Sequence, residues 1–199
     1  QNNFSFVVSV HNTEEFSQVF NLPVNITDPL VVKGNINTID NDLKVSAQAP
    51  NIAYGEYLIK NTLINISNTD SLINLTGDTK FIMDPYDISL DLQSVIQSDS
   101  IQAVLNAKRD STDLNMNINL DATAHFDMDN AGGLISYLKF KPTFWDIGRL
   151  NLSFMPAEIT NEGNKTTISN FGFMVGRGRV LNKYFGVDGA ISDQPQDTL

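Results

Sequence analysis

Residues 113–129 read DLNMNINLDATAHFDMD, with apolar and polar side chains in strict alternation. A period of two residues is the pattern of a β-strand that has one apolar and one wet face. At ~3.3 Å per residue this strand would be roughly 55 Å long, well above the usual strand length. Its apolar series is Leu114, Met116, Ile118, Leu120, Ala122, Ala124, Phe126 and Met128. The other series is almost entirely Asn and Asp, which predicts a sheet with one aqueous face.

Four further stretches repeat this alternation, so most of the chain is predicted to be sheet. Their apolar positions are Leu30, Val32 and Ile36; Leu43, Val45, Ala47 and Ala49; Ile88, Leu90, Leu92 and Ile96; and Ile101, Ala103, Leu105 and Ala107. Turn-forming clusters separate the stretches, at 40–42, 67–70, 84–85, 98–99, 109–111 and 161–164. Consecutive strands joined by short turns predict an antiparallel meander.

Two segments interrupt the strand pattern. Residues 12–15, NTEE, resemble a helix capping box with Asn12 as the cap, and Phe16, Val19 and Phe20 then share one helical face. This predicts a short helix that ends at Leu22-Pro23.

The second interruption, residues 130–138, suits a helical turn or a strand equally, and the sequence leaves both open. We therefore expect one β-rich segment over 1–199, cut from a longer repetitive chain. Within it, residues 1–27 form a short strand plus helix and residues 28–199 form the meander.

The composition excludes several classes of function. The 199 residues carry 13 Lys and Arg against 23 Asp and Glu, a net charge of −10, which argues against nucleic acids and anionic membrane surfaces. There is no cysteine, so disulfides, thiolate zinc sites and cysteine nucleophiles are excluded. No apolar run approaches the ~20 residues of a membrane-spanning helix.

Candidates for catalysis or metal binding are weak. The only histidines are His11, expected in a loop, and His125, expected on the hydrated face of the long strand. The segment 127–132 begins like a calcium loop but has Ala131 and Leu138 where oxygen ligands are needed. We expect no catalytic residue, no metal and no cofactor, and hence no enzyme.

One basic cluster stands out, at residues 176–179, which read GRGR. Two arginines suit a lipid phosphate or an acidic partner, and they equally suit an exposed hairpin tip.

The apolar face is the most informative feature for function. It fits a closed sandwich, in which a second sheet covers the face, and it also fits a sheet curled into a trough that holds acyl chains. The expected lining residues of such a trough are Leu43, Val45, Leu90, Leu92, Ile101, Leu105, Leu114, Met116, Ile118, Leu120, Phe126 and Met128.

Several loose motifs recur along the chain, each a glycine between alternating apolar residues or a polar turn. They are Val32-x-Gly34-x-Ile36, Leu43, Pro50, Tyr54-Gly55, Asn61, Phe144 to Gly148, Ile159, Ile168 to Phe171, Phe185 to Ser192, Pro195 and Asp197 to Leu199. The order of these motifs resembles the TamB (translocation and assembly module) family, which is similar to AsmA-like proteins, in the form found in Bacteroides-like bacteria.

This resemblance implies an all-β fold, a long, curled antiparallel sheet that forms a β-taco-like trough, here with one or two short helices. It implies a section of a periplasmic bridge in a Gram-negative cell, anchored in the inner membrane outside this segment. Such a bridge would carry phospholipid by its acyl chains toward the outer membrane, or assist outer-membrane protein assembly with a barrel partner. It implies no catalytic residue. The alternative is a closed β-sandwich that serves as a protein-interaction or adhesin module.

Overall fold

The computed structural model describes residues 3–192 except 21–22, 27, 70, 84–85, 110–113, 130–131 and 178–179. Fifteen strands and one short helix make up the described chain, and all strand pairs with a defined register are antiparallel. The strands belong to one 15-stranded sheet. The all-β, antiparallel prediction is therefore confirmed. The chain divides into two compact units, unit 1 with residues 1–96 and 107–109 and unit 2 with residues 97–106 and 110–199.

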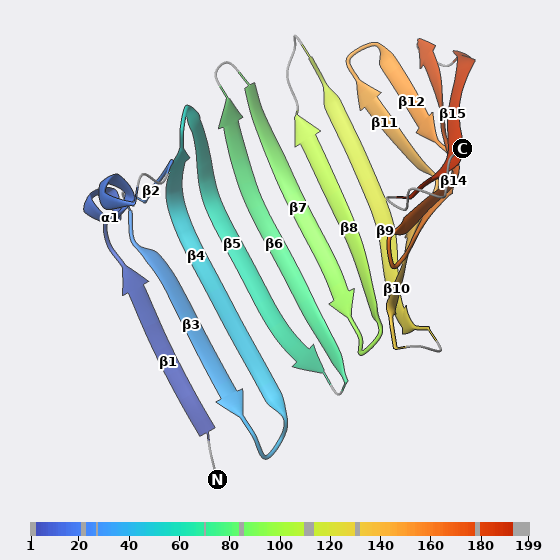
Figure 1. Ribbon diagram of the computed structural model, residues 1–199. Helices are drawn as coiled ribbons and strands as arrows, with labels where there is room; N and C mark the ends of the chain where they lie inside the picture. The colour runs from blue at the N-terminus through green and yellow to red at the C-terminus, as the bar shows by residue number, and fades with distance from the viewer. Residues whose placement is uncertain are drawn as a thin grey trace. The chain divides into compact units, whose positions relative to one another are not determined.

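Unit 1 is a meander of long strands (Figure 1). Its strands are β1 (Asn3–Val10), β2 (Val24–Ile26), β3 (Leu30–Asn37), β4 (Asp42–Tyr54), β5 (Tyr57–Thr69), β6 (Leu72–Met83) and β7 (Tyr86–Ile96). Asn41 and Gly55 occupy the β3–β4 and β4–β5 turns with φ of 52° and 59°. A positive φ is tolerated best by Gly and Asn, so these residue types determine where the hairpins turn.

The regular strand pairing of unit 1 is interrupted on several neighbouring strands. The short strands β2 and β3 follow one another along β4, and Pro29 lies between them. Pro50 lies within β4, and Asn61 on β5 has a φ of 52°, next to a register shift between β5 and β6. Proline cannot donate a ladder hydrogen bond, so these residues interrupt the pairing and bend the strands locally.

The predicted helix is present as α1 (Glu14–Val19). The Asn12 side-chain oxygen accepts a 2.8 Å hydrogen bond from the Glu14 amide, as expected for the cap. Val19 is 77% exposed, so this helix contributes little to a core. The side chains of Glu15 and Phe16 lie outside the described part of the chain.

Unit 2 continues the meander, but two of its strand positions are each split in two. Its strands are β8 (Ser100–Arg109), β9 (Met116–Met128), β10 (Leu134–Phe140), β11 (Thr143–Ile147), β12 (Leu150–Phe154), β13 (Ala157–Glu162), β14 (Lys165–Arg177) and β15 (Val180–Ser192). β10 and β11 follow one another along β9, and β13 and β12 follow one another along β14. The sequence left a helical turn and a strand equally open over residues 130–138, and the structure has a strand at Leu134–Phe140.

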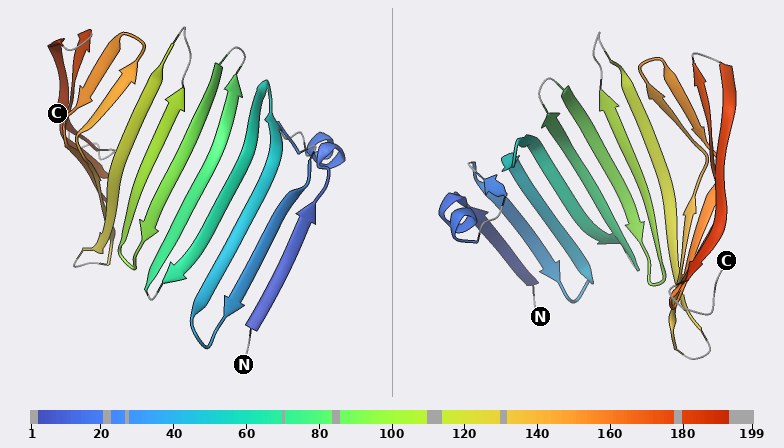
Figure 2. Two further views of the ribbon diagram at one scale, coloured as in Figure 1. Left: turned by 180° about the vertical axis from the view of Figure 1, so that it is seen from behind. Right: turned by 45° about the horizontal axis from the view of Figure 1, so that its top comes forward.

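The regular strand pairing of unit 2 is also interrupted on neighbouring strands, again at proline and asparagine residues. Pro142 separates β10 from β11, Pro156 separates β12 from β13, and Asn170 in β14 has a φ of 57°. The register between β14 and β15 shifts between Ile168 and Phe171. Within unit 2 the sheet is strongly curled, so that β14 is seen edge-on where β9 is seen face-on (Figures 1 and 2).

Two sequence expectations need correction at strand ends. The strand expected over 113–129 begins at Met116, and Asp113 lies outside the described residues. Arg109, expected in a turn, is the last residue of β8 and only 6% exposed. Its guanidinium carbon lies 4.4 Å from the ring centroid of Tyr86, which is a cation–π contact.

The sheet has almost no core. Among the described residues, the hydrophobic side chains that are fully buried are Ala49, Ala107 and Ala157. No second sheet covers the apolar side chains in the part of the chain that the structure describes, since all its strands belong to one sheet. The closed sandwich considered from sequence is therefore not the fold of these residues.

Candidate functional site

The lining residues that were predicted for unit 1 share one face of its strands. Directly paired residues of antiparallel strands point to the same face. Val45 pairs with Ile66 of β5, which pairs with Leu75 of β6, which pairs with Ser94 of β7. The alternation then places the four lining residues predicted for this unit on that face, namely Leu43, Val45, Leu90 and Leu92.

The lining residues that were predicted for unit 2 and lie within its strands likewise share one face. The side chains of Asn106 on β8 and Asn119 on β9 are joined by a 2.7 Å hydrogen bond, so their neighbours in sequence lie on the opposite face. That face carries the predicted lining residues Ile101, Leu105, Met116, Ile118, Leu120, Phe126 and Met128. Leu114 precedes β9, and its Cδ1 lies 2.7 Å from the point where a Gly148 Cβ would be.

Many side chains of these faces are open to solvent. In unit 2, Met128 is 72% exposed, Val187 57% and Phe185 50%. Exposed apolar side chains gathered on one face are typical of surfaces that take an apolar ligand or partner.

Four aromatic rings form a row across the apolar face of unit 2, one from each of four neighbouring strands. Trp145 on β11 lies 4.3 Å from Phe154 on β12, measured between ring centroids. Phe154 lies 5.5 Å from Phe173 on β14, and Phe173 lies 5.2 Å from Phe185 on β15. We call these four residues the aromatic row; such contacts add about 0.5–1.5 kcal/mol per pair beyond area burial.

An apolar pocket of about 210 Å³ opens beside the aromatic row, in the part of unit 2 where the strand pairing is interrupted. Its lining is predominantly hydrocarbon and comes from β9 to β14. The lining residues are Leu120, Phe140, Lys141, Thr143, Trp145, Phe154, Met155, Ala157, Phe171 and Gly172. Residues on both sides of Pro142 and Pro156 line it, so the pocket lies where the strands are interrupted.

The polar groups of the pocket are engaged within the protein. Thr143 Oγ1 and Trp145 Nε1 both donate to the main-chain oxygen of Asn119, the latter at 2.9 Å. Lys141 Nζ lies 2.8 Å from Asp121 Oδ2. The chemistry of the pocket is therefore apolar contact.

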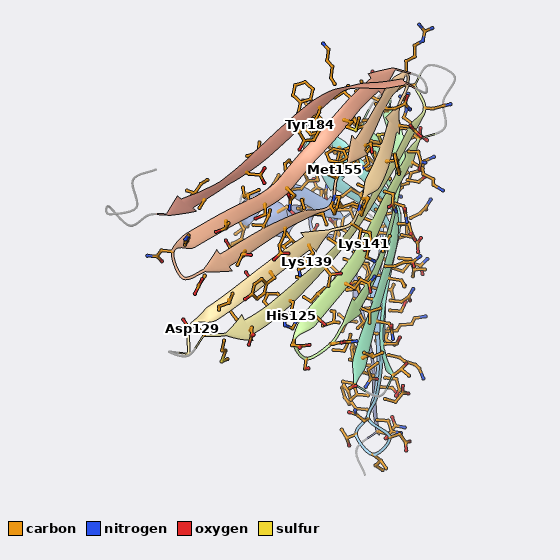
Figure 3. The ribbon with its side chains drawn as sticks, turned by 90° about the vertical axis from the view of Figure 1, so that its right-hand side faces the viewer. His125, Asp129, Lys139, Lys141, Met155 and Tyr184 are labelled. Carbon is orange, nitrogen blue, oxygen red and sulfur yellow. The ribbon has the colours of Figure 1, made fainter. Side chains whose placement is uncertain are left out.

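The opposite face of unit 2 is polar. Lys139 pairs with Glu158 at 3.4 Å, and His125 Nδ1 lies 3.7 Å from Asp99. His125, Lys139 and Tyr184 come from β9, β10 and β15 (Figure 3). The His125 side chain is 46% exposed, so the prediction of a hydrated histidine is confirmed.

Asp129 and the basic cluster do not add to the site. Asp129 Oδ1 accepts from the Gly133 amide, and the Asp129 main-chain oxygen accepts from the Gly132 amide, so this carboxylate closes a turn. In the basic cluster, Gly178 and Arg179 lie outside the described residues, as does the side chain of Arg177.

Sequence reasoning missed the aromatic row and the pocket. The strands β11 and β12 are only five residues long, so the alternation that would reveal their facing side chains is too short to recognise. The one available signal was that Trp145 and Phe154 each lie close to a proline, Pro142 and Pro156.

The described residues hold no cluster of three or more His, Cys, Asp or Glu side chains placed for a metal ion. No helix in the described part of the chain is both long and apolar enough to cross a membrane. Comparison with known proteins found no matching family model, no matching curated protein and no matching solved structure.

Proposed function

We propose that this chain is a lipid-binding section of a longer conduit, and that its apolar faces take up the acyl chains of phospholipids. The observation that carries the proposal is a single-layer sheet with one apolar face per unit and no second layer over it among the described residues. A globular domain of ordinary design would bury those side chains in a core.

Acyl chains fit the chemistry of the faces. Each CH₂ group removed from water contributes ~0.8 kcal/mol to the free energy of binding. Burial of acyl chains on the apolar faces therefore requires no recognition of the lipid head group. The resemblance to the TamB family supports a periplasmic setting with phospholipid as cargo. We include in the proposal that the whole protein is anchored in the inner membrane and works with an outer-membrane assembly barrel.

The test is native mass spectrometry of the purified chain, followed by solvent extraction and identification of any lipid. The informative variant is Ile118→Asp, because Ile118 lies on the apolar face of unit 2 and pairs with Trp145 of the aromatic row. The matched control is Thr123→Asp on the same strand. Thr123 pairs with Lys139, so an aspartate there lies on the polar face beside a positive charge.

Co-purifying phospholipid that is lost in Ile118→Asp and kept in Thr123→Asp supports the proposal, provided both variants keep the wild-type circular dichroism spectrum. A lipid-free mass that does not change on addition of phosphatidylethanolamine vesicles contradicts it. In that case a surface that binds a protein partner becomes the better interpretation.

A further inference from the structure

The apolar pocket of unit 2 is a recess in an otherwise open face. All of its walls come from the strands β9 to β14 and the breaks between them, within residues 120–172. Tyr184 lies on the polar face, because its neighbour Phe185 belongs to the aromatic row on the apolar face. A Cβ at Gly172 would lie 2.6 Å from Tyr184 Oη, so the tyrosine packs behind the main chain of this wall residue. The pocket therefore opens toward the apolar face.

The volume of the pocket limits what it can hold. A dry cavity of about 150 Å³ lined by Leu, Ile and Phe binds benzene, whereas pockets for whole drug-sized ligands take up about 300–1,000 Å³. The pocket of unit 2, at about 210 Å³, lies between these two sizes. In proportion to benzene it holds roughly eight carbon atoms. It is too small for a whole phospholipid and large enough for the end of one acyl chain.

The chemistry of the walls favours a ligand without polar groups. Trp145 Nε1 already donates to the main-chain oxygen of Asn119 at 2.9 Å, and Lys141 Nζ lies 2.8 Å from Asp121 Oδ2. A ligand group with donors or acceptors of its own would lose hydrogen bonds to water without replacing them. Methyl and methylene groups have none to lose.

Two further features suit a hydrocarbon chain. Met155 (Figure 3) lies in the break between β12 and β13 and is 43% exposed, and its flexible thioether side chain can adapt to the shape of a ligand. Trp145 and Phe154 line the pocket and also belong to the aromatic row. A chain that leaves the pocket therefore continues onto the rings of Phe173 and Phe185.

We propose that this pocket is a fixed binding site for the terminal segment of one acyl chain, and that the rest of that chain lies along the aromatic row. The inference rests on the proposed function and adds to it. The apolar face of unit 2 then has one saturable position, at the strand breaks, besides the open surface on which lipid is held without a defined site.

The five methionines of the chain provide the first test. With their methyl groups labelled with carbon-13, NMR follows Met155 in the pocket and Met128, which is 72% exposed on the open face, during titration with benzene. We expect a saturable shift at Met155 with one site per chain, and a small shift without saturation at Met128. A shift at Met155 that does not saturate overturns the proposal.

Ala157→Leu should fill the pocket, because Ala157 is 7% exposed and lines it. The matched control is Ala124→Leu, which adds the same hydrocarbon to the same face at a regular position of β9, opposite Leu138. We expect Ala157→Leu to weaken benzene binding at Met155 by about tenfold or more, and Ala124→Leu to change it by less than about twofold. Benzene binding that Ala157→Leu leaves unchanged overturns the proposal.

Leu120→Ala tests the same site in the opposite direction, which matters if a leucine at position 157 prevents folding. It enlarges the pocket, so the affinity for butylbenzene relative to benzene should rise by about fourfold or more, the gain for one additional buried CH₂. An unchanged ratio of the two affinities contradicts the pocket as the site.

Competition identifies the occupant. Dihexanoylphosphatidylcholine, added below its micelle concentration, should displace benzene from the Met155 site, whereas phosphocholine, which lacks acyl chains, should not. If phospholipid co-purifies with the chain but does not displace benzene, the face binds lipid and the pocket inference alone fails. If phospholipid neither co-purifies nor displaces benzene, the proposed function fails with it.

Discussion

The indole Nε1 of Trp145 donates a 2.9 Å hydrogen bond to the main-chain oxygen of Asn119, and the Thr143 hydroxyl donates to the same oxygen. Two side chains thus donate hydrogen bonds to one carbonyl oxygen. This oxygen lies where the partner of β9 changes from β10, which ends at the pair Ala122–Phe140, to β11, which includes the pair Ile118–Trp145. This oxygen holds the wall of the apolar pocket in place.

Removing both donors should cost more than the sum of the single changes. Each of Trp145→Phe and Thr143→Val leaves the Asn119 oxygen one partner, so we expect each to lower the free energy of unfolding by about 0.5–1.5 kcal/mol. The double variant leaves the oxygen without either side-chain donor, and it should lose about 1–3 kcal/mol more than that sum. Urea unfolding measures all three.

Phe144→Leu is the control, because Phe144 is 65% exposed and lies on the other face of β11. It should change stability by less than about 0.5 kcal/mol. Strictly additive losses for Trp145 and Thr143 would show that the shared oxygen does not couple them.

Asn170 should tolerate glycine but not a β-branched residue. Its φ is 57°, and its amide donates to Asp188, an interaction that any residue other than proline can keep. Asn170→Val should therefore destabilise the fold by about 1–2 kcal/mol, the cost of a left-handed backbone, while Asn170→Gly should be close to neutral. Thermal unfolding compares the two.

The same change at a regular strand position is the control. Asn65 lies within β5 and is not among the residues with positive φ, so Asn65→Val should leave stability nearly unchanged. Equal losses at both positions would mean that side-chain chemistry, and not backbone strain, sets the cost at Asn170.

The sequence predicted the strands well wherever alternation ran long. The stretch from Met116 to Met128 has thirteen residues of unbroken period two, and both its existence and its facing residues were predictable. The turns at Asn41 and Gly163 were equally readable, since both have positive φ and both residue types favour it.

The interruptions of strand pairing were not predictable from the sequence, because the extra residue of a bulge inverts the alternation of apolar and polar residues. Phe140 and Thr143 both line the apolar pocket although they are three residues apart, since Lys141 and Pro142 lie in the break between their strands. A period-two reading across this point assigns one of them to the wrong face. The pocket forms at this inversion, where a period-two pattern fails to predict which side chains face it.

A methyl group at Gly34 should disrupt the pairing of β1 with β3. The Phe6 ring lies over Gly34, and a Cβ there would lie 2.2 Å from Phe6 Cε1. Gly34→Ala should therefore displace Phe6 and destabilise the chain by about 1–3 kcal/mol. Hydrogen exchange should locate the loss in β1, as faster exchange of its amides.

A second substitution separates this clash from a general effect of alanine. With Phe6→Ala already in place, Gly34→Ala meets no ring and should cost close to nothing. If Gly34→Ala costs as much in that background as in wild type, contact with Phe6 is not the cause.

The acid-dependent part of stability should include the pair formed by Asp87 and Lys80, whose charged atoms lie 2.6 Å apart. The hydrogen bond from Lys80, followed by its charge, lowers the pKa of Asp87 below its ordinary value of 3.8. A lowered pKa in the folded state contributes stability above pH 3.8, and the contribution is lost as the pH falls through the lowered value. Both side chains are nearly half exposed, so the effect should shrink in high salt.

Titration of the Asp87 carboxyl by NMR should give a pKa below 3.8 in wild type and a higher value in Lys80→Met. Methionine keeps much of the length of the lysine stem, so the variant removes the charge and the donor while leaving the packing similar. The difference in unfolding free energy between the two proteins should vanish at low pH, where Asp87 is neutral in both. A difference that persists unchanged through acid titration would assign the role of Lys80 to packing of its stem instead of to its charge.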